Sequence, residues 1–477
     1  MKIIIFFLIF VFALPALAYV PSDPMYPEQG YLAQINASFA WDRIQGQGSV
    51  VAVLDSGVDV DHPDLKMNVW RNEDEIPNDG IDNDHNGYID DVNGWDFVSA
   101  MPSPKPKLEK KYDVSSVNHG TAISGLIAAV ANNSKGITGL SFSSKIMPVR
   151  VMDGNGDGDV SVLIEGIKYA VNNKADVINL SLVGYDYAKE LEDIVNWAEE
   201  KGVLIVSASG NGNGGTSGVN LNTSPSYPAC YEKVIAVSAL DENGKKSSFS
   251  NYGTCVDLSA PGEKITSLGY YDSTNPDFTS PYVSNWSGTS FSTALVSAAA
   301  SLVKSKSNYL TPRQIKGILE NSAEDISNVN PEYTGQLGSG QLDAFKAVEE
   351  ADPFFRGKLI KLKDFSAVYY VEDGFKQLFP SERVFWSWHS GNWDQQDIQI
   401  VSQKDFDDLI QKNNIAVREG NLLKFLNSPK IYELWKGELC QVDEVKVKEL
   451  YGENWQNKVL GIQPGFFTNY VLNPNCQ

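Results

Sequence analysis

Short apolar segments alternate with helical segments between Ser49 and Asn321, and this alternation constrains the fold more than any other feature of the sequence. Five segments rich in valine and isoleucine are expected as strands, at 49–54, 146–152, 177–182, 203–208 and 234–239. Helical periodicity appears at 122–132, 163–172, 188–201, 290–304 and 312–320. Continuous apolar strands separated by helices predict a mostly parallel sheet with helices on both faces, which is a three-layer α/β fold.

Three motifs, far apart in the chain, stand at the ends of these segments. They are Val53-Leu54-Asp55-Ser56-Gly57, Asn118-His119-Gly120-Thr121 and Ser287-Gly288-Thr289-Ser290-Phe291-Ser292. Asp55 closes an apolar strand, whereas His119 and Ser290 are each expected to open a helix. In a parallel sheet such positions meet at one edge. A serine, a histidine and an aspartate that meet there supply a nucleophile, a general base and an acid that orients the base.

The order of these motifs and their local frames resemble those of the subtilisin-like serine proteases, over roughly Pro21 to Val348. The resemblance implies a subtilisin-like fold and a secreted endopeptidase that acts on proteins or peptides. In that family Ser290 would attack the substrate, His119 would carry the proton and Asp55 would orient the imidazole. Asn211, in the segment Ser-Ala-Ser-Gly-Asn, matches the asparagine that donates to the oxyanion together with the backbone N–H of Ser290.

Two further segments match the backbone stretches beside which this family binds an extended peptide as an added strand. They are Gly156-Asp157-Gly158 and Ser181-Leu182-Val183-Gly184. Val183 stands where the family usually has a second glycine. We therefore expect its branched side chain to narrow the first specificity pocket or to tilt the substrate strand.

Other departures from the family pattern leave two alternatives open. Relatives usually carry a second histidine at the position of Ala122 and a proline at the position of Ala294. Loss of that proline relaxes the packing behind the nucleophile, which favours a peptide ligase or transpeptidase as one alternative. A catalytically inactive binding protein with the same fold is the other. An α/β-hydrolase esterase is disfavoured, because Ser290 lacks a Gly-x-Ser-x-Gly elbow.

The resemblance also implies a tight calcium site. Asp64 and Asn133 match two of its ligands, and Asp23 looks like the amino-terminal ligand found in thermitase-like members of the family. Hard oxygen ligands gathered from distant segments, completed by backbone carbonyls, suit Ca²⁺. The alternative is that these are three ordinary surface residues.

A second calcium site is expected in the acidic loop 79–91. Asp82, Asp84 and Asn86 stand at alternate positions of a D-x-D-x-N-G pattern, and Asp90 occupies its ninth position. The twelfth position is Asn93 instead of the bidentate glutamate, and flanking helices are not evident. The loop is therefore not an EF-hand. The alternative is a solvated acidic loop without an ion.

The amino terminus and the charge indicate where the protein works and exclude one class of partner. Lys2, an apolar run at 3–14 and the small-residue site Ala16-Leu17-Ala18 predict a signal peptide, residues 1–18. An uncleaved membrane anchor is the alternative, and no other segment is long and apolar enough to cross a bilayer. The net charge of −21, without a basic stripe, argues against nucleic acid as a partner.

The length of 477 residues and a change in composition predict two folded domains, a peptidase domain at 19–350 and a C-terminal domain at 351–477. The second domain contains a degenerate repeat with a period of 63 residues, in which Gly357-Lys358-Leu359 corresponds to Gly420-Asn421-Leu422. Alternating segments at 367–371 and 430–434 indicate small β-rich repeats. We expect a structural module or one that anchors the enzyme to a surface or polymer. Aromatic side chains that form its core are favoured over exposed binding rings.

Four cysteines in an exported protein predict disulfides. Cys230 and Cys255 fall in the first domain, and Cys440 and Cys476 in the second. Pairing within each domain is the simplest of three connectivities, and four buried thiols are the alternative.

Overall fold

The computed structural model describes residues 19–308 and 310–351, and beyond them a series of shorter stretches. These stretches are 358–363, 365–372, 375–379, 384–385, 398–401, 403, 406, 410–411, 421–425, 429–435, 438–451, 455–462 and 471–473. The expected signal peptide and Cys476 lie outside the described residues. No helix in the described part of the chain has the length and apolar character needed to cross a membrane.

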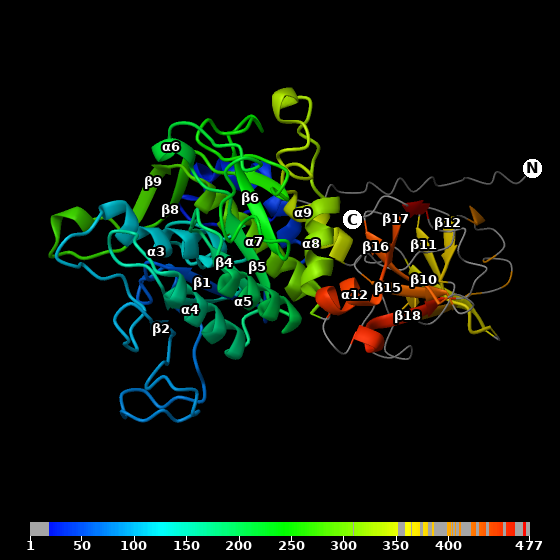
Figure 1. The fold of residues 1–477 in the computed structure, drawn as a ribbon, viewed down its shortest axis with the longest axis horizontal. Coiled ribbons are helices and arrows are strands. Elements are labelled where there is room, and N and C mark those ends of the chain that lie inside the picture. The colour runs from blue at the N-terminus through cyan, green and yellow to red at the C-terminus, as the bar shows by residue number, and fades with distance from the viewer. Residues whose placement is uncertain are drawn as a thin grey trace, which may run out of the picture.

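A seven-stranded parallel sheet lies at the centre of the first domain (Figure 1). Its strand order is β2-β3-β1-β4-β5-β6-β7. The strands are β1 (Val50–Asp55), β2 (Trp95–Asp96), β3 (Lys145–Arg150), β4 (Val177–Leu180), β5 (Leu204–Ala208), β6 (Val234–Leu240) and β7 (Leu258–Pro261). The five predicted strands are confirmed with small shifts at their ends. The expectation missed β2 and β7, because both are too short to carry a pattern.

Helices cover both faces of this sheet, as the alternation predicted. The longer ones are α3 (Val114–Ala128), α4 (Val160–Asn172), α5 (Lys189–Glu200), α7 (Thr289–Lys306), α8 (Pro312–Asn321) and α9 (Ala344–Ala351). One core cluster packs α3, α7, α8 and α9 against one face, and a second packs α4 and α5 against the other. Burial of these two apolar layers is the main source of the domain's stability.

Short elements complete the first domain. They are α1 (Gly30–Gln34), α2 (Ala37–Trp41), α6 (Gly212–Gly215), the hairpin of β8 (Ile265–Leu268) and β9 (Tyr282–Trp286), and the 3₁₀ turns Tyr26–Glu28, Lys66–Asn68, Pro276–Phe278 and Pro331–Tyr333. Cys230 and Cys255 form a disulfide with an S–S distance of 2.08 Å.

The expectation that His119 opens a helix was wrong. α3 begins at Val114, and the side chain of Asp113 caps it by accepting the backbone N–H of Ser116 at 2.9 Å. The first turn, Val-Ser-Ser-Val, combines two serines with two valines, and the helical pattern on which the expectation rested is continuous only from residue 122. His119 therefore lies inside a helix that is already formed, which holds its backbone more firmly than a first turn would.

The C-terminal region contains two five-stranded sheets of equivalent strand order (Figure 1). The first sheet is β13-β10-β11-β12-β14 and the second is β18-β15-β16-β17-β19. The strands of the first are β10 (Lys358–Leu362), β11 (Tyr369–Glu372), β12 (Phe375–Leu378), β13 (Ile398–Val401) and β14 (Ile410–Gln411). Those of the second are β15 (Leu422–Phe425), β16 (Ile431–Trp435), β17 (Glu438–Val442), β18 (Val459–Ile462) and β19 (Val471–Asn473). The expectation of a β-rich region is confirmed.

The same strand pairing occurs in both sheets, at positions that differ by the repeat period. Leu359 lies opposite Tyr370 in the first sheet, and Leu422 lies opposite Glu433 in the second, at positions 63 residues further on. One buried cluster contains rings and aliphatic groups from both sheets, among them Tyr370 and Tyr432. In the described residues these aromatic side chains build a core, as the sequence favoured. In the second copy, α12 (Glu444–Tyr451) and the 3₁₀ turn Trp455–Lys458 pack on the other face of the sheet. Gly357 and Gly420, the first residues of the two repeat motifs, lie outside the described residues.

The second sheet contacts the first domain through ion pairs. The Nη2 atom of Arg313, on α8, donates to Oε2 of Glu433 at 2.9 Å, and Lys446 on α12 lies 3.4 Å from Glu232. A cavity of about 550 Å³ separates the two surfaces beside these pairs. Leu204 and Lys233 line it, next to the amino ends of β5 and β6. The C-terminal region therefore docks at the amino ends of the strands. The catalytic side chains were expected at the opposite, carboxyl ends.

We predict that Leu295→Ala lowers the free energy of unfolding by about 2–5 kcal/mol, because Leu295 is fully buried at the centre of α7 and its loss leaves a cavity. Urea unfolding in a Ser290→Ala background, which avoids self-digestion, measures the change. Glu200→Ala, an exposed substitution at the end of α5, is the control and should change the value by no more than about 0.5 kcal/mol. Equal effects of the two substitutions would contradict this description of the core.

Candidate active site

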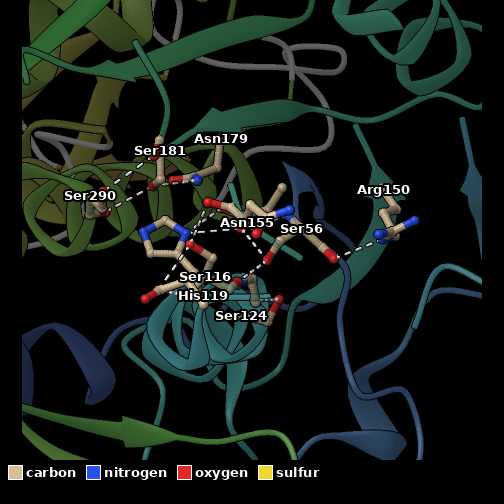
Figure 2. Close-up of polar contacts among 12 residues, drawn as sticks. Ser56, Ser116, His119, Ser124, Arg150, Asn155, Asn179, Ser181 and Ser290 are labelled. Carbon is tan, nitrogen blue, oxygen red and sulfur yellow. Dashed lines mark hydrogen bonds and ion pairs between the residues drawn. The ribbon is translucent and has the colours of Figure 1, made fainter. Parts of the chain in front are cut away.

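The expected catalytic residues lie together at one edge of the sheet. They come from the carboxyl ends of β1 and β5 and from α3 and α7. Asp55 is the last residue of β1, and Ser290 is the second residue of α7. Asn211 follows β5, and His119 projects from the second turn of α3. Figure 2 shows His119, Ser181 and Ser290 at this edge. Four segments that are distant in the sequence thus supply one site.

His119 is paired with a fully buried carboxylate. Its Nδ1 lies 2.9 Å from both carboxylate oxygens of Asp55, and Ser56 donates its backbone N–H to Oδ1 of Asp55 at 2.7 Å. Burial by itself would lower the pKa of His119, but the charge of Asp55 and its hydrogen bond outweigh burial and raise that pKa above its ordinary value. The carboxylate fixes the tautomer with hydrogen on Nδ1, so Nε2 is left as the basic atom.

Glycine next to His119 makes this close pairing feasible. A Cβ atom placed on Gly120 would lie 2.3 Å from the carbonyl oxygen of Gly57 and 3.0 Å from Cβ of Asp55. No side chain fits there without a shift of the backbone. α3 therefore approaches the end of β1 closely enough for the imidazole to reach the carboxylate.

Ser290 shares a cavity of about 340 Å³ with His119 and Asn211. Its Oγ donates to the backbone carbonyl of Ser181 at 3.2 Å, and the Oγ of Ser181 donates to the carbonyl of Ser290 at 3.0 Å. The described residues show no hydrogen bond between Ser290 and His119 in this resting arrangement. Catalytic hydrogen bonds are often looser without substrate than in the reacting complex.

The amide of Asn211 is held in one orientation. Its Oδ1 accepts the backbone N–H of Thr289 at 3.0 Å and the hydroxyl of Thr289 at 3.1 Å. Since the oxygen is used in this way, Nδ2 is the atom that faces the cavity, and it lies near Gly288. The site therefore contains a fixed N–H donor beside the nucleophile, which is the arrangement that stabilises an oxyanion.

A second cavity, of about 380 Å³, extends from His119 between the two predicted substrate segments. Of the six residues named for substrate binding, five line it: Gly156, Gly158, Ser181, Val183 and Gly184. Asp157 does not, because its backbone N–H and carbonyl instead close the turn with Asp153. Gly184 already pairs with Tyr227 as an antiparallel bridge, so this backbone has the extended form that an added strand requires.

Val183 leans over the neighbouring segment. Its Cγ1 atom lies 3.4 Å from the position that a Cβ atom on Gly210 would occupy. Gly210 follows β5 in a left-handed conformation (φ +100°), so the two segments flank the slot next to Ser290. The isopropyl group occupies space that a glycine would leave open, and it therefore reduces the room for a substrate side chain.

Asp23, Asp64 and Asn133 lie together around loop 132–138. Asp64 accepts the Nδ2–H of Asn133 at 2.6 Å, and Asp23 accepts the backbone N–H of Asn133 at 3.0 Å. Burial raises the pKa of Asp64 to about 6, and the charge of Asp23 adds to this effect. Both carboxylates accept hydrogen bonds from this loop, and the charge of Lys135 acts to lower the pKa of Asp64. Two buried carboxylates beside an amide oxygen are nevertheless donors of the kind that Ca²⁺ takes.

In the acidic loop the carboxylates that lie close together are partly different from the calcium ligands expected from the sequence. Carboxylate oxygens of Asp82 and Asp84 and of the buried Glu75 lie within 4.8 Å of one another. The side chain of Asn86 donates to Asp84 at 3.0 Å. The carboxylate of Asp90 instead accepts the backbone N–H groups of residues 79 and 80. Sequence reasoning missed Glu75, because it lies seven residues before Asp82 and outside the D-x-D-x-N-G pattern.

The fold and the site together define a serine peptidase of the parallel α/β type. Residues 46–343 match the model of the subtilase family (Peptidase_S8), and the chain belongs to this family. It is therefore a subtilisin-like serine endopeptidase.

Known relatives match about two thirds of this chain. The chain is 37% identical to thermitase of Thermoactinomyces vulgaris over 332 residues, which are 69% of this chain and 100% of thermitase. It is 34% identical to subtilisin Savinase of Lederbergia lenta, with 66% of this chain and 96% of the relative covered. A solved structure of a protease from Pseudoalteromonas arctica aligns with a TM-score of 0.57 and 26% identity, over 69% of this chain and 99% of that one.

We predict that Asp55→Asn lowers kcat by about 10⁴-fold and moves the acid limb of the pH profile to lower pH. His119 must be neutral to accept a proton, and its pKa falls when the charge that raises it is removed. Measurement of kcat/KM against pH with a peptide substrate tests both effects. Asp61→Asn, which removes an exposed carboxylate elsewhere, is the control and should leave the limb in place. If the acid limb of the pH profile did not move in Asp55→Asn, the result would contradict the pairing of Asp55 with His119.

Proposed function

We propose that this protein is a secreted, calcium-stabilised endopeptidase that hydrolyses peptide bonds through Asp55, His119 and Ser290. The observation that carries the proposal is the 2.9 Å pairing of His119 with buried Asp55, beside a cavity that Ser290 and Asn211 also line. Family membership supports it, because the subtilisin-like endopeptidases share this chemistry.

In the first half of the reaction, Ser290 Oγ attacks the carbonyl carbon of the scissile bond. His119 Nε2 takes the hydroxyl proton, and the negative Asp55 stabilises the imidazolium that forms. The carbonyl oxygen becomes an oxyanion, which accepts hydrogen bonds from Asn211 Nδ2 and the backbone N–H of Ser290. His119 then donates its proton to the leaving amine as the C–N bond breaks, and Ser290 is left acylated.

In the second half, water replaces the leaving amine. His119 removes a proton from the water, which attacks the acyl carbon, and the same two donors hold the second oxyanion. The serine leaves with the proton from His119, and the enzyme is restored. Each residue thus acts twice, in the one cavity that His119, Asn211 and Ser290 line.

Calcium enters the proposal as a structural ion. Asp23, Asp64 and Asn133 would hold one ion, and Glu75, Asp82, Asp84 and Asn86 a second. Bound there, Ca²⁺ would compensate carboxylates that the fold brings close together, and it would fix loops without a part in the chemistry.

The remaining parts of the proposal concern place and organisation. Secretion rests on the predicted signal peptide 1–18 and on relatives such as the extracellular protease of Xanthomonas campestris. We assign residues 351–477 to a separate module that attaches the enzyme to a surface or polymer. Its docking at the amino ends of β5 and β6 supports this role, because such a module leaves the cleft free for substrate.

A labelling experiment with a fluorophosphonate probe tests the proposal. The probe forms a covalent bond only with an activated serine, so we expect labelling of residues 19–477 and no labelling of the Ser290→Ala variant. Absence of labelling in a folded, calcium-loaded protein would overturn the proposal and favour an inactive binding protein. Product analysis with an added amine separates hydrolysis from ligation, and a dominant aminolysis product would favour the ligase alternative.

We predict that calcium raises the melting temperature of the Ser290→Ala protein, by an amount equivalent to about 2.7 kcal/mol for each of the two sites when its concentration is 100 times that site's dissociation constant. Asp64→Asn should remove one part of this gain, and Glu75→Gln another. Calorimetric scans with and without a chelator measure both. Asp90→Asn is the matched control in the same loop, since the carboxylates of Asp90 and Glu75 both accept backbone N–H groups but only that of Glu75 lies in the cluster with Asp82 and Asp84. Equal losses in Glu75→Gln and Asp90→Asn would contradict the second ligand set.

A further inference from the structure

The cavity of about 380 Å³ beside His119 has an apolar interior. Leu163 of α4, Leu191 of α5 and Met152 line it, and all three are buried. Leu182, between the two substrate-binding positions Ser181 and Val183, also lines it. The interior therefore favours the aliphatic part of a substrate side chain.

The charged residues that line this cavity all have the same sign. Asp159 and Asp186 line it and are exposed, and none of its described lining residues is lysine or arginine. Asp159 accepts the hydroxyl and backbone N–H of Ser161, which lower the pKa of its carboxyl and keep it ionised. Asp186 has no hydrogen bond or ion pair within the described part of the chain.

The nearest cation in the sequence does not neutralise this pair. Lys189, at the start of α5, is bound by Asp193 and by Glu192 at 3.3 Å. The negative charges of Asp159 and Asp186 at the entrance of the cavity are therefore available to bind a cationic group of a ligand. A cationic head on an aliphatic stem matches both the apolar interior and the acidic entrance.

We propose that this cavity selects a lysine or arginine side chain of the substrate, on the acyl side of the scissile bond. The inference deepens the proposed endopeptidase function and rests on it. The acyl side follows from the resemblance to the family, because the cavity is lined by Gly156, Gly158 and Ser181–Gly184, the two segments beside which that family binds the substrate strand, whereas Ser290 and Asn211 line the other cavity.

The aliphatic stem packs against the leucines while the cation remains at the hydrated entrance, between Asp159 and Asp186. Because the cation is not buried, it loses little hydration. Exposed ion pairs are individually weak, so two of them together should favour the cation by roughly threefold to tenfold at low salt. High salt should reduce this preference.

A set of internally quenched peptides tests the proposal. Lysine, norleucine or glutamate is placed in turn at each of four positions before the scissile bond. Norleucine has the same aliphatic stem as lysine without the charge, so the ratio of the two kcat/KM values isolates the effect of the cation. We expect a ratio of roughly three to ten at one position, with glutamate the poorest substrate there, and a ratio near one at about 1 M salt.

Two substitutions and a control locate the preference. Asp159→Asn retains a side chain that caps α4, and Asp186→Asn removes the second charge. The double variant should bring the lysine-to-norleucine ratio to about one. Glu190→Gln removes an equal charge from the same surface outside the cavity lining, and it should leave the ratio unchanged.

A ratio at or below one in the wild-type enzyme at every position would overturn the proposal, as would a preference that survives in the double variant. Either result leaves the proposed function intact, because the peptides are still cleaved. Failure of the proposed function has a different signature, in which no peptide is cleaved and the fluorophosphonate probe does not label Ser290.

Discussion

The pairing of His119 with buried Asp55 is the interaction on which the site depends. A carboxylate without exposure is costly unless it is paired, and here it meets the imidazole Nδ1 at 2.9 Å and the backbone N–H of Ser56. Only the close approach of α3 to the end of β1 allows this geometry, and glycine at position 120 permits that approach. The buried carboxylate of Asp55 must be paired with His119. The sheet, the packing of α3 and the glycine beside the histidine together make this pairing possible.

The parts of the fold with strong local patterns could be predicted from the sequence. β4, β5 and β6 are buried along their whole length, so their continuous apolar segments identify them. The start of α3 was not predicted, because the turn after the cap at Asp113 is too short and too mixed in polarity to identify a helix before the clear pattern at residue 122. β2 and β7 are short strands whose pairing depends on neighbours far away in the chain.

The same distinction holds for the site. Asp55, His119 and Ser290 stand in compact motifs, and the order of those motifs carries most of the information. Glu75 approaches Asp82 and Asp84 only through the path of an irregular loop, which no local pattern encodes. The sequence places Asp90 in a ligand position, whereas the structure uses its carboxylate to hold the turn at residues 79 and 80. Side-chain direction within a loop is set by backbone hydrogen bonds, and spacing alone does not specify it.

The central claim is that Ser290 forms a covalent acyl-enzyme after proton transfer to His119. Rapid acid quench of the enzyme with an ester substrate, followed by mass spectrometry of the peptide that contains Ser290, tests it most directly. The account predicts an added acyl mass on Ser290 within the first turnover, and its loss when Asp55 is replaced by asparagine. Product formation without any acyl mass on Ser290 would contradict the account.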